Sequence, residues 1–260
     1  MSLIVASILV LMFLNLVLGS VSIPLKSVWN IICGLGDEPV TWQNIVWKSR
    51  LPQALTALVA GAGLAISGLQ MQTVFRNPLA GPSVLGISSG ASMGVAFVVL
   101  LSGSLGGVAL SKLGFMGEIA LSIAAVIGSL SVMALIVYVS QKVKGNVTLL
   151  IIGVMIGYVA NAVIGVLKFF SVEEDIRAYV IWGLGSFSRV SGNQMMLFVA
   201  IMAILIPLSF LLIKTLNLML LGDGYARNLG LNIKRARLLV ITSAAVSYTH
   251  LRAHETTLHL

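Results

Sequence analysis

The chain has 260 residues, of which 58% are hydrophobic and 9% are charged, and its mean hydropathy is +1.05. Soluble domains carry about a quarter charged residues, so this chain has too few polar side chains to cover a surface that faces water. The formal net charge is +8, but the Lys and Arg residues lie in short connections between apolar runs, which argues against nucleic-acid binding. The composition predicts an integral membrane protein.

Long uncharged runs divide the chain. A helix needs roughly 20 apolar residues to cross a bilayer, and backbone amides must be paired in lipid, so we expect each long run to form a helix. The sequence therefore predicts an all-α, polytopic transmembrane helical bundle with six full spans and the start of a seventh. The six runs are residues 1–25, 51–75, 77–111, 119–141, 145–167 and 190–213, and the seventh covers 238–246, which is too short to cross.

The first run is followed by an amphipathic connection. No Lys or Arg precedes residues 1–25 and no A-x-A site follows, so we interpret the run as a retained span and not as a signal peptide. Residues 22–50 then predict two short helices, with Pro24 and Pro39 as breaks. Their tryptophans suit the membrane–water interface, and the helices either lie on the bilayer or dock another protein. Their apolar positions are Val28, Trp29, Ile32, Trp42, Ile45 and Val46.

Small residues at helical spacing mark the next spans. Pro78, Gly81 and Pro82 restrict the crossing part of the third run to residues 84–101. There Gly86, Gly90 and Gly94 recur every four residues, and such spacing lets helices approach closely in lipid. Polar, uncharged side chains accompany them and either line a pathway or form hydrogen bonds between helices. They are Gln70, Gln72, Thr73, Ser88, Ser89, Ser92, Tyr158 and Asn161.

The six spans lack charged and histidine side chains away from their ends. Proton relays and ion-coupled carriers need buried ionisable groups, and an intramembrane enzyme needs a nucleophile and a base. The sequence also contains no G-x-x-x-x-G-K-[ST] phosphate loop. If transport is driven by ATP, another subunit must therefore bind the nucleotide. We predict no metal site, since His250, His254 and His259 do not have H-E-x-x-H spacing.

Two later connections differ in character. Residues 170–194 carry the acidic triplet at positions 173–175 together with Trp182, which is typical of a solvated cap. Residues 222–231 place Tyr225 and Leu229 one turn apart, with small residues at Ala226 and Gly230. This pattern predicts a short helix with a glycine stop that fits a groove on a soluble partner. The positive-inside rule favours a cytoplasmic location for this second connection.

Several motifs in order resemble one known family. Residues 50–52 (RLP), 76–82 (RNPLAGP) and 85–91 (LGISSGA) are similar to the FecCD-type permeases of bacterial ABC importers. The family's coupling element, G-[DE]-x-x-A-x-x-L-G, is matched here as well. The matching residues are Gly222, Asp223, Ala226, Leu229 and Gly230. The resemblance covers residues 1–246, which we define as the permease domain, whereas the tail at 247–260 resembles the product of a frameshift or an assembly artefact.

The resemblance implies an ATP-driven importer subunit in the bacterial inner membrane. Family members have about ten spans and carry an iron(III)–siderophore, haem or cobalamin from the periplasm to the cytoplasm. It implies that ATP and Mg bind to a partner ABC ATPase, so that this chain binds no cofactor and is not an enzyme. The other expected partners are a periplasmic substrate-binding protein, a second permease copy and membrane lipid, with no nucleic acid.

The resemblance also suggests roles for particular residues. Residues 222–230, including Arg227, would dock into the ATPase, and Arg50 would pair with acidic residues of the binding protein. Gln53 stands where the family often has a second arginine, which weakens that contact. The positions expected to serve helix packing or the pathway are Gly86, Ser88, Ser89, Gly90, Gly94 and Asn161. A passive channel or membrane scaffold is the alternative of another class.

Overall fold

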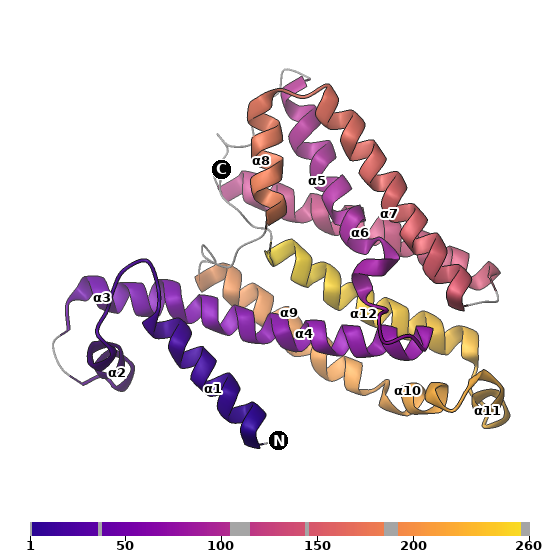
Figure 1. The fold of residues 1–260 in the computed structure, drawn as a ribbon, viewed down its shortest axis with the longest axis horizontal. Coiled ribbons are helices and arrows are strands. Elements are labelled where there is room, and N and C mark those ends of the chain that lie inside the picture. Colours follow the sequence, from indigo (N-terminus) through magenta and orange to yellow (C-terminus); the bar gives the residue numbers. More distant parts are fainter. Residues whose placement is uncertain (1, 36–37, 105–114, 144–145, 185–191, 256–260) are drawn as a thin grey trace.

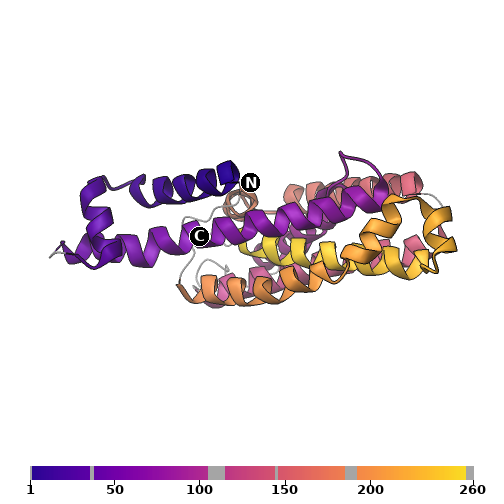
Figure 2. The same ribbon diagram turned by 90° about the horizontal axis from the view of Figure 1, so that it is seen from below.

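The protein is a bundle of helices (Figure 1). The computed structural model describes residues 2–35, 38–104, 115–143, 146–184 and 192–255, and every regular element in these ranges is helical. Both views place α2 and α3 at one end of the molecule and α10 and α11 at the other (Figures 1 and 2). The predicted all-α bundle is confirmed.

The N-terminal part begins with α1 (Ser2–Val17) and α2 (Leu25–Cys33). Next, α3 (Val40–Ile45) continues through a π-helical stretch, η1 (Val46–Arg50), into α4 (Leu51–Phe75). The helices α2 and α3 start directly after Pro24 and Pro39, because proline fixes its own φ and disfavours helical backbone in the residue before it. The two short helices predicted in this connection are confirmed.

The middle of the chain packs around α5 (Ile87–Ser104), which follows a 3₁₀ turn, η2 (Pro82–Leu85). Helix α5 contacts α6 (Phe115–Lys142), α7 (Asn146–Phe169) and α8 (Glu173–Leu184). The prediction of a solvated cap around residue 175 is wrong. Helix α8 buries Ala178, Tyr179 and Trp182 in the same apolar cluster as α5, because removing apolar surface from water is favourable. Of its acidic first turn, Glu173 and Glu174 stay exposed while Asp175 is buried.

The C-terminal part contains α9 (Gly192–Phe210), α10 (Ile213–Leu220), α11 (Asp223–Asn228) and α12 (Ile233–Glu255). Helices α9 and α10 form a bent pair with an angle of 47°. Helix α12 lies centrally, against α4, α6 and α9, and Val240 and Ala244 are fully buried.

The seventh helix is longer than its apolar run. The apolar run ends at residue 246, whereas the helix continues to Glu255. Ser247 and Thr249 are buried just beyond that point, because small polar side chains pack well between helices. The side chains of His250 and His254, and all of His259, lie outside the residues that the structure describes.

The helices within the described residues differ in length. By length and composition, three of the described helices could cross a membrane: Val40–Phe75, Ala120–Lys142 and Val147–Phe169, and the bent pair of α9 and α10 makes a fourth. Helices α1 and α5 are apolar but shorter. The turns after Val17 and around Gly86 set the end of α1 and the start of α5, and the number of six spans stays a prediction.

Candidate functional site

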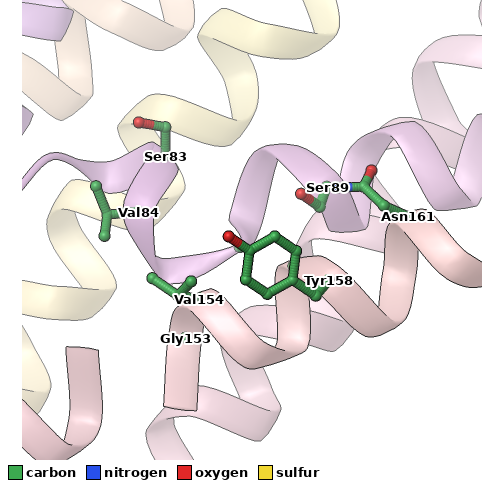
Figure 3. A pocket seen from close by; sticks show the side chains of 9 residues that line it. Ser83, Val84, Ser89, Gly153, Val154, Tyr158 and Asn161 are labelled. Carbon is green, nitrogen blue, oxygen red and sulfur yellow. The ribbon is translucent and has the colours of Figure 1, made fainter. Parts of the chain in front are cut away.

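A groove of about 340 Å³ lies between α7 on one side and η2 with the start of α5 on the other (Figure 3). Tyr158 and Asn161 from α7 lie across from Ser89 of α5, and Ser83 marks the η2 end. The groove thus combines polar groups with an apolar wall that includes Val84. The structure brings together three of the polar side chains that the sequence marked as a possible lining.

Gly86 fixes the width of this groove. Its φ is +73°, in the left-handed region that favours glycine. A β-carbon there would lie 2.9 Å from the carbonyl oxygen of Gly153 and 3.1 Å from the amide nitrogen of Gly157. The small-residue spacing therefore brings η2 and α7 into backbone contact.

The other glycines of α5 pack on a different helix. A β-carbon at Gly90 would lie 2.7 Å from the carbonyl oxygen of Gly128, and one at Gly94 would overlap the carbonyl of Ala124. Both partners belong to α6. Gly90 and Gly94 thus serve packing and are not among the residues that line the groove, and Ser88 is half-buried beside them.

A polar contact inside the bundle was not found from the sequence. Gln70 is 1% exposed, and its amide donates to the hydroxyl of Ser243 at 3.4 Å, which lies 3.2 Å from the hydroxyl of Ser209. These residues join α4, α12 and α9. Gln70 is thus an interior contact and not part of the groove. The only signal was a polar residue in an apolar run, which does not reveal its partner.

The predicted coupling element forms α11 at the far end of the bundle from α2. Gly222 precedes it with a φ of +106°, and Gly230, with a φ of +85°, lies just beyond its last turn. Ala226 is fully buried, whereas Tyr225 and Leu229 are 69% and 58% exposed. Ala226 therefore packs against its own chain, whereas the exposed side of this segment carries Tyr225 and Leu229 together with the polar Arg227 and Asn228.

Asp223 joins this helix to two other segments. One carboxylate oxygen lies 2.6 Å from Nη2 of Arg76, at the end of α4, and the other lies 3.4 Å from Nη2 of Arg237, on α12. Arg76 Nη2 also donates to the carbonyl oxygen of Met219 at 3.2 Å. Asp223 thus contacts its own chain, whereas Arg227 on the same helix is exposed.

Arg50 is buried instead of being displayed to a partner. It is 4% exposed, and its Nη1 donates 2.8 Å hydrogen bonds to the carbonyl oxygens of Leu16 and Val17. Its Nη2 donates to the carbonyl oxygen of Val21. The carbonyls of Leu16 and Val17 belong to the last turn of α1, where helix acceptors lack intrahelical partners, and that of Val21 lies beyond the helix. This geometry favours a structural role, in which Arg50 binds the end of α1, over the predicted contact with a binding protein.

The chain is similar to proteins of one transport family. The model of the FecCD transport family matches residues 7–250. The haemin transport system permease protein HmuU of Yersinia pestis is 33% identical over 88% of this chain and 65% of its own length. The vitamin B12 import system permease protein BtuC of Serratia proteamaculans is 36% identical over 76% of this chain and 56% of its own.

A solved structure shares the fold. It is an inward-facing conformation of a metal-chelate type ABC transporter, with a TM-score of 0.76 and 26% identity, over 95% of this chain and 72% of that one. The chain thus spans 65% and 56% of the lengths of the two curated relatives named above.

Proposed function

The chain belongs to the FecCD transport family, and on this premise we propose that it is the permease subunit of an ATP-driven importer. Its apolar helices make it a membrane protein. The observation that carries the proposal is α11 at one end of the bundle, where Tyr225 on the helix and Leu229 directly after it are exposed. Exposed apolar side chains on a short helix suit a groove on a second protein.

In this proposal a separate ABC ATPase supplies the energy. The chain has no phosphate-binding loop, so ATP and Mg would bind to that partner, and this chain is a transport subunit and not an enzyme. The exposed side chains of Tyr225, Arg227 and Leu229 would form the contact. Ala226 would support α11 from behind, since it is fully buried.

The groove between η2 and α7 is proposed as part of the wall along which cargo passes. Its polar groups are uncharged hydroxyls and one amide, which can contact a large solute without binding it tightly. The cargo would be an iron(III)–siderophore or a related metal chelate, moving from periplasm to cytoplasm across the bacterial inner membrane. Haem and cobalamin are the alternatives, as the names of the relatives indicate. A periplasmic binding protein and a second permease copy complete the proposed assembly.

Reconstitution tests this proposal. The chain would be placed in liposomes with a candidate ABC ATPase and a candidate periplasmic binding protein from the same organism. Uptake of a radiolabelled ferric siderophore, haemin and cyanocobalamin would be measured with and without ATP. We expect uptake of one cargo class that depends on ATP. Uptake that does not need ATP would indicate a passive channel instead.

A pair of variants tests the docking face. Replacing Tyr225 and Leu229 together by alanine should abolish co-purification of the ATPase without lowering the unfolding temperature, because both side chains are exposed. Phe170→Ala is the matched control, since Phe170 is 72% exposed and follows the far end of α7. Normal complex formation by the double variant would contradict the docking role of α11.

A further inference from the structure

We propose that Arg76, Asp223 and Arg237 form an ionic joint that passes movement of α11 to the wall of the groove. This inference rests on the proposed coupling function of α11 and goes beyond it. The three residues come from the end of α4, the start of α11 and the first turns of α12. Asp223 would therefore be a positioning residue that transmits movement and not part of the docking face.

Arg76 holds both sides of the turn that leads into α11. The same Nη2 atom donates to the Asp223 carboxylate at 2.6 Å and to the carbonyl oxygen of Met219 at 3.2 Å. Met219 lies in the last turn of α10, and Asp223 is the first residue of α11. Between them Gly222 adopts a left-handed φ of +106°, where the chain can swivel more easily than at other residues. The guanidinium therefore spans a hinge.

Arg237 ties the same carboxylate to the core of the bundle. Its side chain is 10% exposed, and its Nη2 lies 3.4 Å from the second oxygen of Asp223. Its Nε has no hydrogen-bond partner within the described part of the chain. A buried guanidinium depends on its carboxylate partner, so any displacement of Asp223 changes the environment of α12 as well.

Arg76 is connected directly to the groove. It is the residue at which α4 ends, and the chain then runs through η2 to Gly86. Ala80 and Leu85 on this stretch are buried in the main apolar cluster, so the segment cannot move without its neighbours. Ser83, Val84 and Gly86 line the groove. Movement of Arg76 would therefore reach the groove wall along the chain, first through the exposed Pro78 and Leu79 and then through the part that is packed at Ala80 and Leu85.

The ion pair between Arg76 and Asp223 is weak enough to break and form again. The side chains of Arg76 and Asp223 are 43% and 39% exposed, and ion pairs at such positions are screened by water and salt. They add little to folding stability, yet they direct which segments move together. The cluster can thus open and close again during each transport cycle.

The test measures coupling separately from assembly. In the reconstituted complex, Asp223→Asn should still co-purify with the ATPase, while cargo uptake per ATP hydrolysed falls roughly tenfold, within the usual range of allosteric coupling. Asp223→Glu should restore the ratio, because it keeps the charge. Glu174→Gln removes an exposed carboxylate on α8 and should leave both the co-purification and the uptake ratio unchanged.

A second measurement does not depend on transport. With Cys33→Ser as background, a fluorophore on Ser83→Cys should report a change at the groove when the ATPase and ATP are added, and this change should disappear with Asp223→Asn. An unaltered signal and uptake ratio in Asp223→Asn would overturn the joint. Loss of co-purification would also overturn it, since Asp223 would then be part of the docking contact. Failure of the proposed function is distinct, because it shows in the unsubstituted complex as uptake without ATP.

Discussion

Gly19 lies directly against the guanidinium of Arg50: a β-carbon at residue 19 would come within 2.8 Å of Nη2 of Arg50. The chain after α1 therefore turns around the arginine, which in turn binds the carbonyl oxygens of Leu16, Val17 and Val21. The arginine thus joins α1 to the start of α4.

We predict that Arg50→Leu lowers the free energy of unfolding by about 1 to 3 kcal/mol, because three buried or partly buried carbonyls lose their donor. The unfolding temperature of the detergent-purified protein would measure this. Lys48→Leu is the control, since Lys48 is an exposed cation on the same π-helical stretch. An unchanged unfolding temperature together with weaker attachment of a periplasmic binding protein would support the docking role instead.

The contact between Gly86 and α7 gives a second prediction. Gly86→Ala should destabilise the fold by about 1 to 3 kcal/mol from its left-handed backbone alone, and the clash with Gly153 adds to this. Gly165→Ala on α7 is the matched control, because a β-carbon there meets no atom within 4 Å. Thermal unfolding in detergent should separate the two variants, and equal unfolding temperatures would contradict the close contact.

The helices were predictable because their signals are local. Apolar run length and proline breaks placed α2, α3, α4, α6 and α7 closely. The burial of α8 was not predictable from the sequence. Its acidic first turn suggests a helix exposed to water, whereas Tyr179 and Trp182 pack on a helix that is distant in the sequence. The extent of α12 was missed for a similar reason, since burial of Ser247 depends on its neighbours in the bundle.

The site was predictable only in part. Motif spacing identified the glycines that bring helices together, but it did not show that Gly86 contacts α7 while Gly90 contacts α6. The coupling motif also grouped Ala226 with Leu229, although the structure buries the first side chain and exposes the second. The pairing of Asp223 with Arg76 joins residues that are far apart in the sequence, and a single sequence contains no signal for such a pair.

Asp175 gives a pH-dependent prediction. Burial raises the pKa of its carboxyl, and the nearby charge of Glu174 raises it further. The folded chain therefore keeps this proton to higher pH than the unfolded chain does. Between the ordinary value of 3.8 and the raised pKa, the contribution of this group to stability should fall as pH rises, and above that range it should stay low.

Asp175→Asn should therefore be more stable than the unsubstituted chain at neutral pH, and this advantage should vanish at acidic pH where Asp175 is protonated in both states. Unfolding temperatures across a pH series would measure the difference. Glu173→Gln, an exposed neighbour on the same turn, should show no such gain. A constant difference at all pH values would mean that titration of Asp175 does not contribute.

The last prediction concerns whether the groove beside α7 is filled with water. If cargo passes along it, Tyr158, which is 64% exposed and lines the groove, must face an aqueous space. In a Cys33→Ser background, Tyr158→Cys should react with a charged, membrane-impermeant thiol reagent several-fold faster than Val166→Cys. Val166 is similarly exposed at 59% on the same helix, but it is not among the residues that line the groove.

A thiol surrounded by lipid stays protonated and unreactive, whereas one in water can ionise. Ala160→Cys, which is 2% exposed, sets the rate for a packed position. Equal rates at 158 and 166 would show that the groove is filled by lipid or protein and would remove it from the pathway.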